Sequence, residues 1–268
     1  MRPVLHRTAI ATACLSTLLL AACGKHVASN APITWAPADT PYLFANFKGA
    51  PADVSTAWGQ AGDAVIAMRI QQLGKIAATL SDKDPAVAKV LEAMQAELQN
   101  VHSIKELAQT TGFSQSALSA IYGVGDVPVA RVELESPDAF KAFWARVEKR
   151  AGITTPTATL DGQSYWVLGG DDARLHVLVA IEGKQLVATV APSKASPEML
   201  KQLLGLTKPA SNASDRLAKI NGQHGYSDFG SGYVDLPKLF ANLYDGKNAV
   251  TQEFAKDLGG SLADPVCA

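Results

Sequence analysis

Apolar residues recur at helical intervals in the part of the chain that follows residue 50. Between Val54 and Leu80 they return every three or four positions, which predicts one long amphipathic helix despite internal glycines. Asp84 and Pro85 then provide an N-cap and a proline at the first helical position, and a second apolar stripe runs through residues 87–101. We expect these two helices to pack as a hairpin.

Two shorter elements flank the predicted hairpin. Residues 42–47 form an aromatic-rich run between a proline and a glycine, which is typical of a buried strand. Ser103 and Glu106 have the spacing of a capping box, so a short third helix should begin there and end near Gly112.

Strand-like alternation dominates from residue 127 onward. Residues 127–134 predict a strand in which Val129, Arg131 and Glu133 share one face. A serine, a proline and a terminal glycine predict a helix over residues 136–152. Four short runs separated by turns rich in Asp and Gly then predict an antiparallel meander: residues 155–160, 163–168, 174–181 and 185–190.

Helical signals return near the C-terminus. Ser196 opens one helix, and Ser211 or Ser214 opens the next. A strand is expected over residues 226–234, followed by helices that begin at Asp235 and Thr251. The predicted class is therefore α+β, an antiparallel β meander packed with amphipathic helices that include a long N-terminal helical hairpin.

The composition excludes several classes of protein. With 268 residues, 47% of them hydrophobic and 18% charged, the chain is an ordinary globular one rather than a disordered, collagen-like or disulfide-rich one. The 24 Lys and Arg residues are balanced by 25 Asp and Glu residues, so no excess of positive charge is available for phosphate groups. We therefore expect no nucleic-acid partner.

The first 23 residues carry an export pattern. A basic start with Arg2 and Arg7 precedes an apolar run over residues 8–20 that is too short to span a bilayer. The run ends in Leu20-Ala21-Ala22-Cys23, which resembles the lipobox of bacterial lipoproteins. The resemblance implies a diacylglycerol on the Cys23 thiol, cleavage between Ala22 and Cys23, and a further acyl chain such as palmitate on the new amine. The alternatives are an ordinary secretory leader and a short anchor that is never cut.

The leader divides the chain into three expected parts. These are a signal peptide over residues 1–22, a lipidated Cys23 with a flexible tether over residues 23–38, and an α+β periplasmic domain over residues 39–262. Acyl chains would hold the protein at a membrane surface without spanning it. In enterobacteria, an Asp directly after the lipidated cysteine resembles the signal for retention at the inner membrane, and this chain has Gly24 at that position. We therefore expect the periplasmic face of the outer membrane, with the inner membrane second.

Cys267 has no expected partner in its own chain. Cys14 leaves with the leader and the Cys23 thiol is consumed by the lipid, so in an oxidising compartment Cys267 is an isolated thiol next to the last residue. It could pair with another molecule. We favour the reading in which the natural fold continues beyond this point, so that the chain is a truncated form.

One segment resembles the helix-turn-helix of DNA-binding repressors. Residues 107–119 read as a helix, a turn at Gly112 and a second helix that opens with Ser114 and Gln115. The segment follows an export signal, and its flanks lack the Lys and Arg that contact phosphates. We therefore predict a structural pair of helices and no DNA reader.

The sequence carries no catalytic or metal-binding signature. No Gly-x-Ser-x-Gly, Ser-x-x-Lys or His-Glu-x-x-His motif occurs. Asp171 and Asp172 lie beside two glycines, where turn chemistry predicts them. We expect no catalytic residue, no metal and no cofactor. Zinc ligands occur at close, regular spacings, whereas the histidines of the mature chain are far apart in the sequence: His26, His102, His176 and His224.

Two blocks of the mature chain, residues 38–46 and residues 129–152 with the strands that follow, resemble uncharacterised envelope lipoproteins of Gram-negative bacteria. The resemblance spans residues 38–245, and that group carries no established activity and implies no functional residue. We therefore expect a membrane-anchored lipoprotein whose periplasmic, non-enzymatic domain acts in envelope maintenance or as an interaction module for another envelope component.

Two other functions stay open. The alternative is a periplasmic carrier that encloses a lipid or other apolar ligand. On the second face of the predicted sheet, Leu178 and Ala180 lie beside Arg174 and His176, so this face is partly apolar. A hydrolase with a dispersed site is the third hypothesis.

Overall fold

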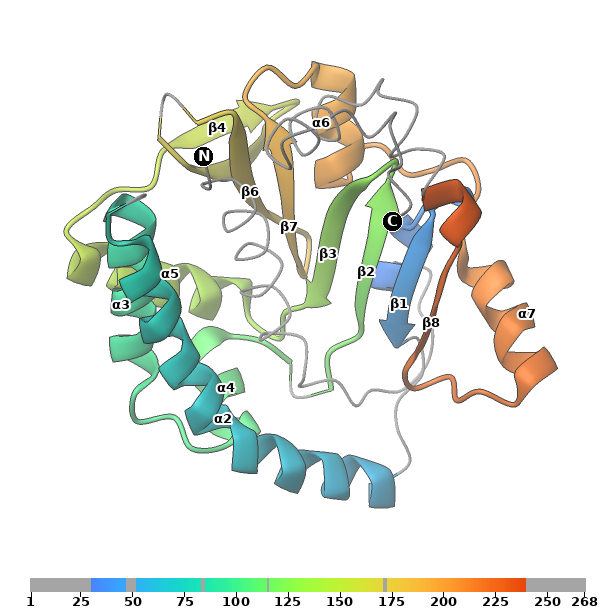
Figure 1. Ribbon diagram of the computed structural model, residues 1–268, viewed down its shortest axis with the longest axis horizontal. Helices are drawn as coiled ribbons and strands as arrows, with labels where there is room; N and C mark the ends of the chain where they lie inside the picture. Colours follow the sequence, from blue (N-terminus) through green and yellow to red (C-terminus); the bar gives the residue numbers. More distant parts are fainter. Residues whose placement is uncertain (1–29, 47–51, 83–84, 115, 171–172, 240–268) are drawn as a thin grey trace, which may run out of the picture.

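The computed structural model describes residues 30–46, 52–82, 85–114, 116–170 and 173–239. These residues form an α+β fold with one eight-stranded antiparallel sheet and seven helical segments (Figure 1). The strands are β1 (Tyr42–Asn46), β2 (Ser119–Val124), β3 (Val127–Glu133), β4 (Thr157–Leu160), β5 (Gln163–Leu168), β6 (Leu175–Glu182), β7 (Gln185–Pro192) and β8 (Ser231–Val234). The helices are the 3₁₀ turn η1 (Pro32–Trp35), α2 (Ala52–Leu80), α3 (Pro85–Leu98), α4 (Ile104–Thr111), α5 (Pro137–Ala151), α6 (Pro197–Leu204) and α7 (Ser214–His224).

The sheet has the strand order β4-β5-β6-β7-β3-β2-β1-β8. Strands β4 to β7 are joined consecutively by hairpins, as the alternating pattern and the turn residues predicted. At the centre β7 pairs with β3, and beyond β3 lie β2, β1 and β8. The helix that follows β3 leads into β4 at one edge, and the helices that follow β7 lead into β8 at the other edge.

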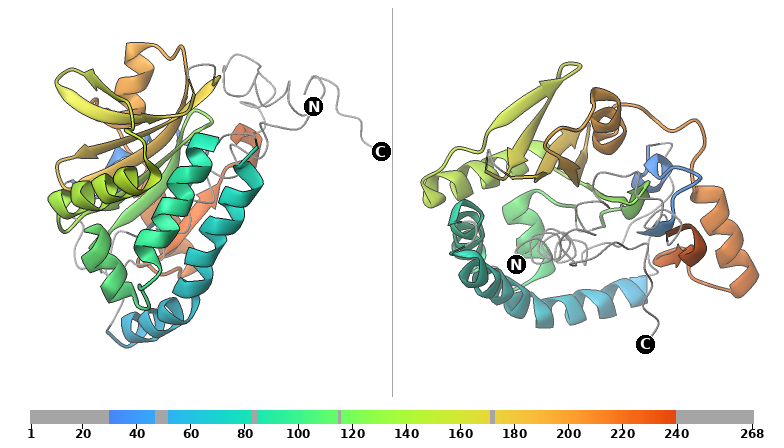
Figure 2. Two further views of the ribbon diagram at one scale, coloured as in Figure 1. Left: turned by 90° about the vertical axis from the view of Figure 1, so that its left-hand side faces the viewer. Right: turned by 45° about the horizontal axis from the view of Figure 1, so that its top comes forward.

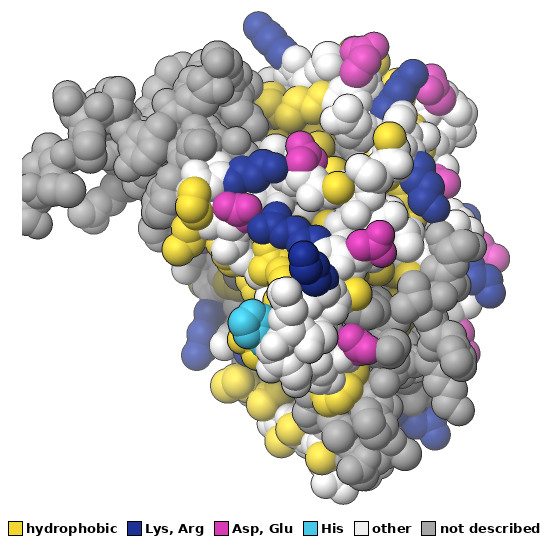
Figure 3. Space-filling view, turned by 90° about the vertical axis from the view of Figure 1, so that its right-hand side faces the viewer, with side chains coloured by type: hydrophobic (Ala, Val, Ile, Leu, Met, Phe, Trp, Pro, Cys, Tyr) yellow, Lys and Arg dark blue, Asp and Glu magenta, His cyan; other side chains and the backbone are white. Residues whose placement is uncertain are grey.

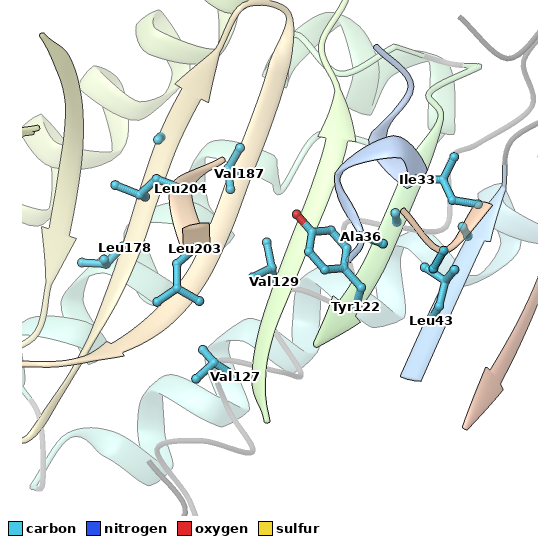
Figure 4. Packing of buried hydrophobic residues seen from close by; sticks show 14 of the residues in the cluster. Ile33, Ala36, Leu43, Tyr122, Val127, Val129, Leu178, Val187, Leu203 and Leu204 are labelled. Carbon is cyan, nitrogen blue, oxygen red and sulfur yellow. The ribbon is translucent and has the colours of Figure 1, made fainter. Parts of the chain in front are cut away.

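One face of the sheet is covered by η1, α6 and α7. Leu43, Tyr122, Val129 and Val187 project from four strands into a single buried cluster (Figure 4). Leu203 and Leu204 of α6 enter the same cluster and are fully buried. Removing a side chain of this size from water contributes about 1.5–3 kcal/mol, so this layer is a main source of stability.

The other face is covered by α5 and by aromatic packing. The ring of Phe140 on α5 lies 5.8 Å from that of Phe113 and 6.2 Å from that of Trp166 on β5, centroid to centroid. Trp144, one turn further along α5, lies 6.2 Å from the same Trp166 ring. The amphipathic stripe of α5 is thus fixed against β5.

Helices α2 and α3 form a further layer outside α5. Figure 2 shows them side by side, and Ile70 and Leu73 of α2 share a buried cluster with Leu91 of α3 and Val147 of α5. Residues 83–84, where the hairpin connection was expected, lie outside the described residues. Gly74 allows the two helices to approach closely, because a β-carbon there would meet the side-chain amide of Gln95.

Serine caps begin the helices where the sequence predicted them. The hydroxyls of Ser103, Ser136 and Ser196 accept hydrogen bonds from backbone N–H groups three residues later. Glu106 also accepts a hydrogen bond of 2.7 Å from the backbone N–H of His102, one residue before the N-cap. Glycines in the left-handed conformation end α4, α5 and α6.

The predicted helix pair at residues 107–119 is wrong in its second half. Helix α4 ends at Thr111 and Gly112 turns the chain as expected. The next residues lead directly into β2 at Ser119 instead of forming a second helix. The physical reason is tertiary: Phe113 bridges to Leu134, and Leu118 accepts a hydrogen bond from Glu133, so this stretch pairs with the end of β3.

Candidate functional site: the docked lead segment and a buried arginine

Residues 30–40, here called the lead segment, belong to the folded unit, and several of their side chains are packed into the core. Ala31, Ile33 and Ala36 are 0%, 1% and 0% exposed. This corrects the expected flexible tether over residues 23–38, because the part from residue 30 onward belongs to the folded unit. The expectation relied on small residues and prolines, but small side chains also allow a chain to lie flat on a sheet face.

Backbone hydrogen bonds hold the lead segment at its C-terminal end. Ala38 donates to the Ser211 carbonyl over 3.1 Å, and Ala213 donates to the Ala36 carbonyl over 2.9 Å. The hydroxyl of Thr40 accepts from the Gly123 backbone over 2.9 Å. The segment is therefore tied both to the approach to α7 and to the sheet.

Arg131 lies beneath the lead segment and is 0% exposed. Its guanidinium donates to the Gln185 side-chain oxygen over 2.7 Å and to the Leu204 carbonyl over 3.1 Å. The indole of Trp35 stacks on it, with the guanidinium carbon 4.1 Å from the ring centroid. One cation thus connects β3, β7, the C-terminal end of α6 and η1. We call Trp35, Tyr122, Arg131, Gln185 and the Leu204 carbonyl the arginine cluster.

The electrostatics of the arginine cluster are those of a buried cation held by dipoles. Burial lowers the pKa of Arg131, and the nearby Tyr122 and Glu182 oppose that change. Arginine is not deprotonated in proteins, so the guanidinium carries its charge at neutral pH. The Leu204 carbonyl belongs to the last turn of α6, where the helix dipole is negative and favours a cation.

Gly205 makes room for the guanidinium. This residue ends α6 at a φ of +73°, and a β-carbon there would lie 1.5 Å from an Arg131 terminal nitrogen. Both the left-handed backbone and the close approach favour glycine. Among the described atoms, the Nε of Arg131 has no hydrogen-bond partner.

The cluster continues toward the start of the lead segment. The Gln185 amide accepts from Arg131 through its oxygen and donates through its nitrogen to the Asn30 carbonyl. The buried arginine therefore fixes the position of Asn30, the first described residue. With a cation buried against carbonyl groups and an indole, this arrangement suits a structural clamp and offers no general base or nucleophile.

The sequence pattern placed Arg131 on the same strand face as Val129 and Glu133, without indicating that this face is buried. The structure buries both faces of β3, so Val129 and Arg131 are as buried as Ala130 and Val132. A single charge within the otherwise apolar stretch from Val127 to Val132 was the available signal for a buried cation.

The other predicted site residues lie apart from the arginine cluster. Ala22, Cys23 and Cys267 fall outside the described residues, as do Asp171 and Asp172. Over the described parts of the chain, no group of three or more His, Cys, Asp or Glu side chains could hold a metal ion. The described histidines are on the loop before α4, on β6 and at the end of α7: His102, His176 and His224.

A second surface of interest is the sheet edge formed by β1 and β8, next to α7. Phe44 and Val234 are 50% and 44% exposed on neighbouring strands, and the Phe44 ring lies against Gly232. Tyr226 and Leu236, which flank β8, are more than half exposed. Figure 3 shows this side of the molecule, where hydrophobic side chains lie between charged ones.

Comparison with known proteins finds no relative: the chain matches no protein-family model, no curated protein and no solved structure. Among the helices of the described residues, none is long and apolar enough to cross a membrane.

Proposed function

We propose that this chain is a bacterial lipoprotein, cleaved between Ala22 and Cys23 and anchored through acyl chains on Cys23. The observation that carries the proposal is the Leu20-Ala21-Ala22-Cys23 pattern at the end of a short basic and apolar leader. Support comes from the lead segment, since its packing provides a fixed attachment point on the domain seven residues after Cys23.

We infer a non-enzymatic role for the domain, on the periplasmic face of the outer membrane. It acts in envelope maintenance or as an interaction module, and it displays the α2 and α3 helical hairpin away from the sheet. Support comes from the charged side chains that the structure pairs with one another. Glu97 of α3, for example, accepts hydrogen bonds from Arg146 and Arg150 of α5, which ties the hairpin to that helix.

Incorporation of labelled palmitate tests the anchor. Cells expressing the wild-type chain should yield a labelled protein in the membrane fraction, and Cys23→Ser should abolish the label. Cys267→Ser serves as the matched control, because it removes a thiol outside the lipobox and should leave labelling intact. Equal labelling of wild type and Cys23→Ser, or no labelling of wild type, would contradict the proposal.

The alternative is a carrier for a lipid or other apolar ligand. Leu178 and Ala180, which suggested an apolar binding face, are 3% and 0% exposed. Leu178 packs in the same buried cluster as Leu203 of α6, so these residues serve as core. Native mass spectrometry of the purified protein distinguishes the two roles, because a co-purifying lipid of constant mass supports a carrier and an empty domain supports an interaction module.

A further inference from the structure

The lead segment limits how far the domain can move from a lipid anchor. Six residues, 24–29, separate Cys23 from Asn30. Seven Cα-to-Cα steps span at most about 25 Å even when fully extended. A chain that was flexible up to residue 38 would have had more than twice that reach.

The position of Asn30 selects one end of the sheet. Asn30 is bonded to Gln185, the first residue of β7, directly after the exposed Lys184 of the β6–β7 turn. The register places Gln185 opposite Glu133, at the same end of the sheet as Asn46 and Ser119. The opposite end carries the β2–β3 turn and the exposed Lys194, which follows β7.

We propose that the domain is held with the β6–β7 end of its sheet facing the bilayer surface, and that the arginine cluster sets this orientation by fixing Asn30. The inference rests on the lipid anchor proposed above. It goes beyond that anchor because it names the surface that meets the lipid headgroups and leaves the β2–β3 end directed away from the membrane.

The charges at this end indicate that the tether, and not attraction to lipid, sets the orientation. Among the described residues at this end, Glu135, Glu182 and Lys184 are of mixed sign, so they form no basic patch for anionic headgroups. The strand β7 of eight residues separates the two sheet ends by about 25 Å. The seven steps from Cys23 to Asn30 would therefore have to be fully extended before the β2–β3 end could reach the bilayer surface.

Quenching of a thiol-linked fluorophore by a headgroup nitroxide lipid tests the orientation. The matched variants are Lys184→Cys and Lys194→Cys, two exposed lysines at opposite ends of β7, each in the full-length lipidated protein with Cys267→Ser. The protein is reconstituted into vesicles of phosphatidylethanolamine and phosphatidylglycerol. Quenching at position 184 should exceed that at position 194 by about threefold, because the quencher acts only near the surface.

A lengthened tether provides the second variant. Inserting about 30 Gly and Ser residues between Ala28 and Ser29 adds a coil of roughly 30 Å, which should abolish the difference between the two labels. Equal quenching in the unmodified protein, or stronger quenching at position 194, would overturn the orientation while leaving the anchor in place. A protein that carries no acyl chain and does not float with vesicles would instead refute the anchor, and the orientation with it.

Discussion

A methyl group added at Gly205 should destabilise the protein by several kilocalories per mole, because the space it would occupy is filled by the Arg131 guanidinium. In Gly205→Ala the new β-carbon would lie 1.5 Å from a terminal guanidinium nitrogen and 2.6 Å from Cζ. The guanidinium has little freedom to move, since it is bonded to the Gln185 oxygen at 2.7 Å and stacked on Trp35.

The magnitude follows from two separate costs. An alanine at a φ of +73° costs about 1 kcal/mol for the left-handed backbone alone. Displacing Arg131 weakens its hydrogen bonds to Gln185 and Leu204, and bonds to a charged group are worth about 1.5–3 kcal/mol each. We expect a loss of about 4 kcal/mol in the free energy of unfolding, or a fall of roughly 10 °C in Tm.

Gly152→Ala is the matched control. Gly152 ends α5 at a φ of +66°, yet a β-carbon there would meet no atom within 4 Å. It should therefore lose only the backbone cost of about 1 kcal/mol. Urea denaturation of both purified variants, followed by tryptophan fluorescence, measures the difference. If the two variants lost the same stability to within about 0.5 kcal/mol, the role assigned to Arg131 would be refuted.

Three further substitutions test other parts of the structure. Trp35→Ala removes the ring stacked on Arg131 and should cost about 2 kcal/mol and speed proteolysis within the lead segment; unchanged cleavage would contradict the docking. Asn46→Ala removes buried bonds to the Ala117 carbonyl and to Ser119, so urea denaturation should show a loss of about 2 kcal/mol, and a loss near zero would count against these bonds. The two arginines of α5 lower the pKa of Glu97, which therefore stabilises the fold above the ordinary glutamate pKa of 4.5. At neutral pH the wild type should have a free energy of unfolding about 1 kcal/mol or less above that of Glu97→Gln. Denaturation curves should show this difference shrinking as the pH falls below 4.5, and a difference that grows would contradict the coupling.

Local signals were sufficient for the elements whose ends depend on neighbouring residues. The caps at Ser136 and Ser196 and the terminal glycines of α4 and α5 are confirmed, because a cap satisfies backbone groups within the same turn. The meander of β4 to β7 was predictable for the same reason, since each hairpin is set by its own turn.

Long-range pairing was beyond the same signals. The place of β3 between β7 and β2, and of β8 beside β1, depends on contacts between residues far apart in the chain. The stretch after Gly112 has the residues of a helix start but becomes the approach to β2, because pairing with the end of β3 outweighs its weak local preference. The arginine cluster is the same kind of case, as its members come from five separate elements.

The sequence by itself determined most of the helices and the strands of the meander, because each of these depends on periodicity or on a few adjacent residues. It also carries the export pattern that ends at Cys23. Only the tertiary structure decided that Arg131 is buried and that Ala31, Ile33 and Ala36 belong to the core. A charge can be removed from water only where carbonyl groups and an indole from distant segments converge on it, and that convergence exists only once the sheet has formed.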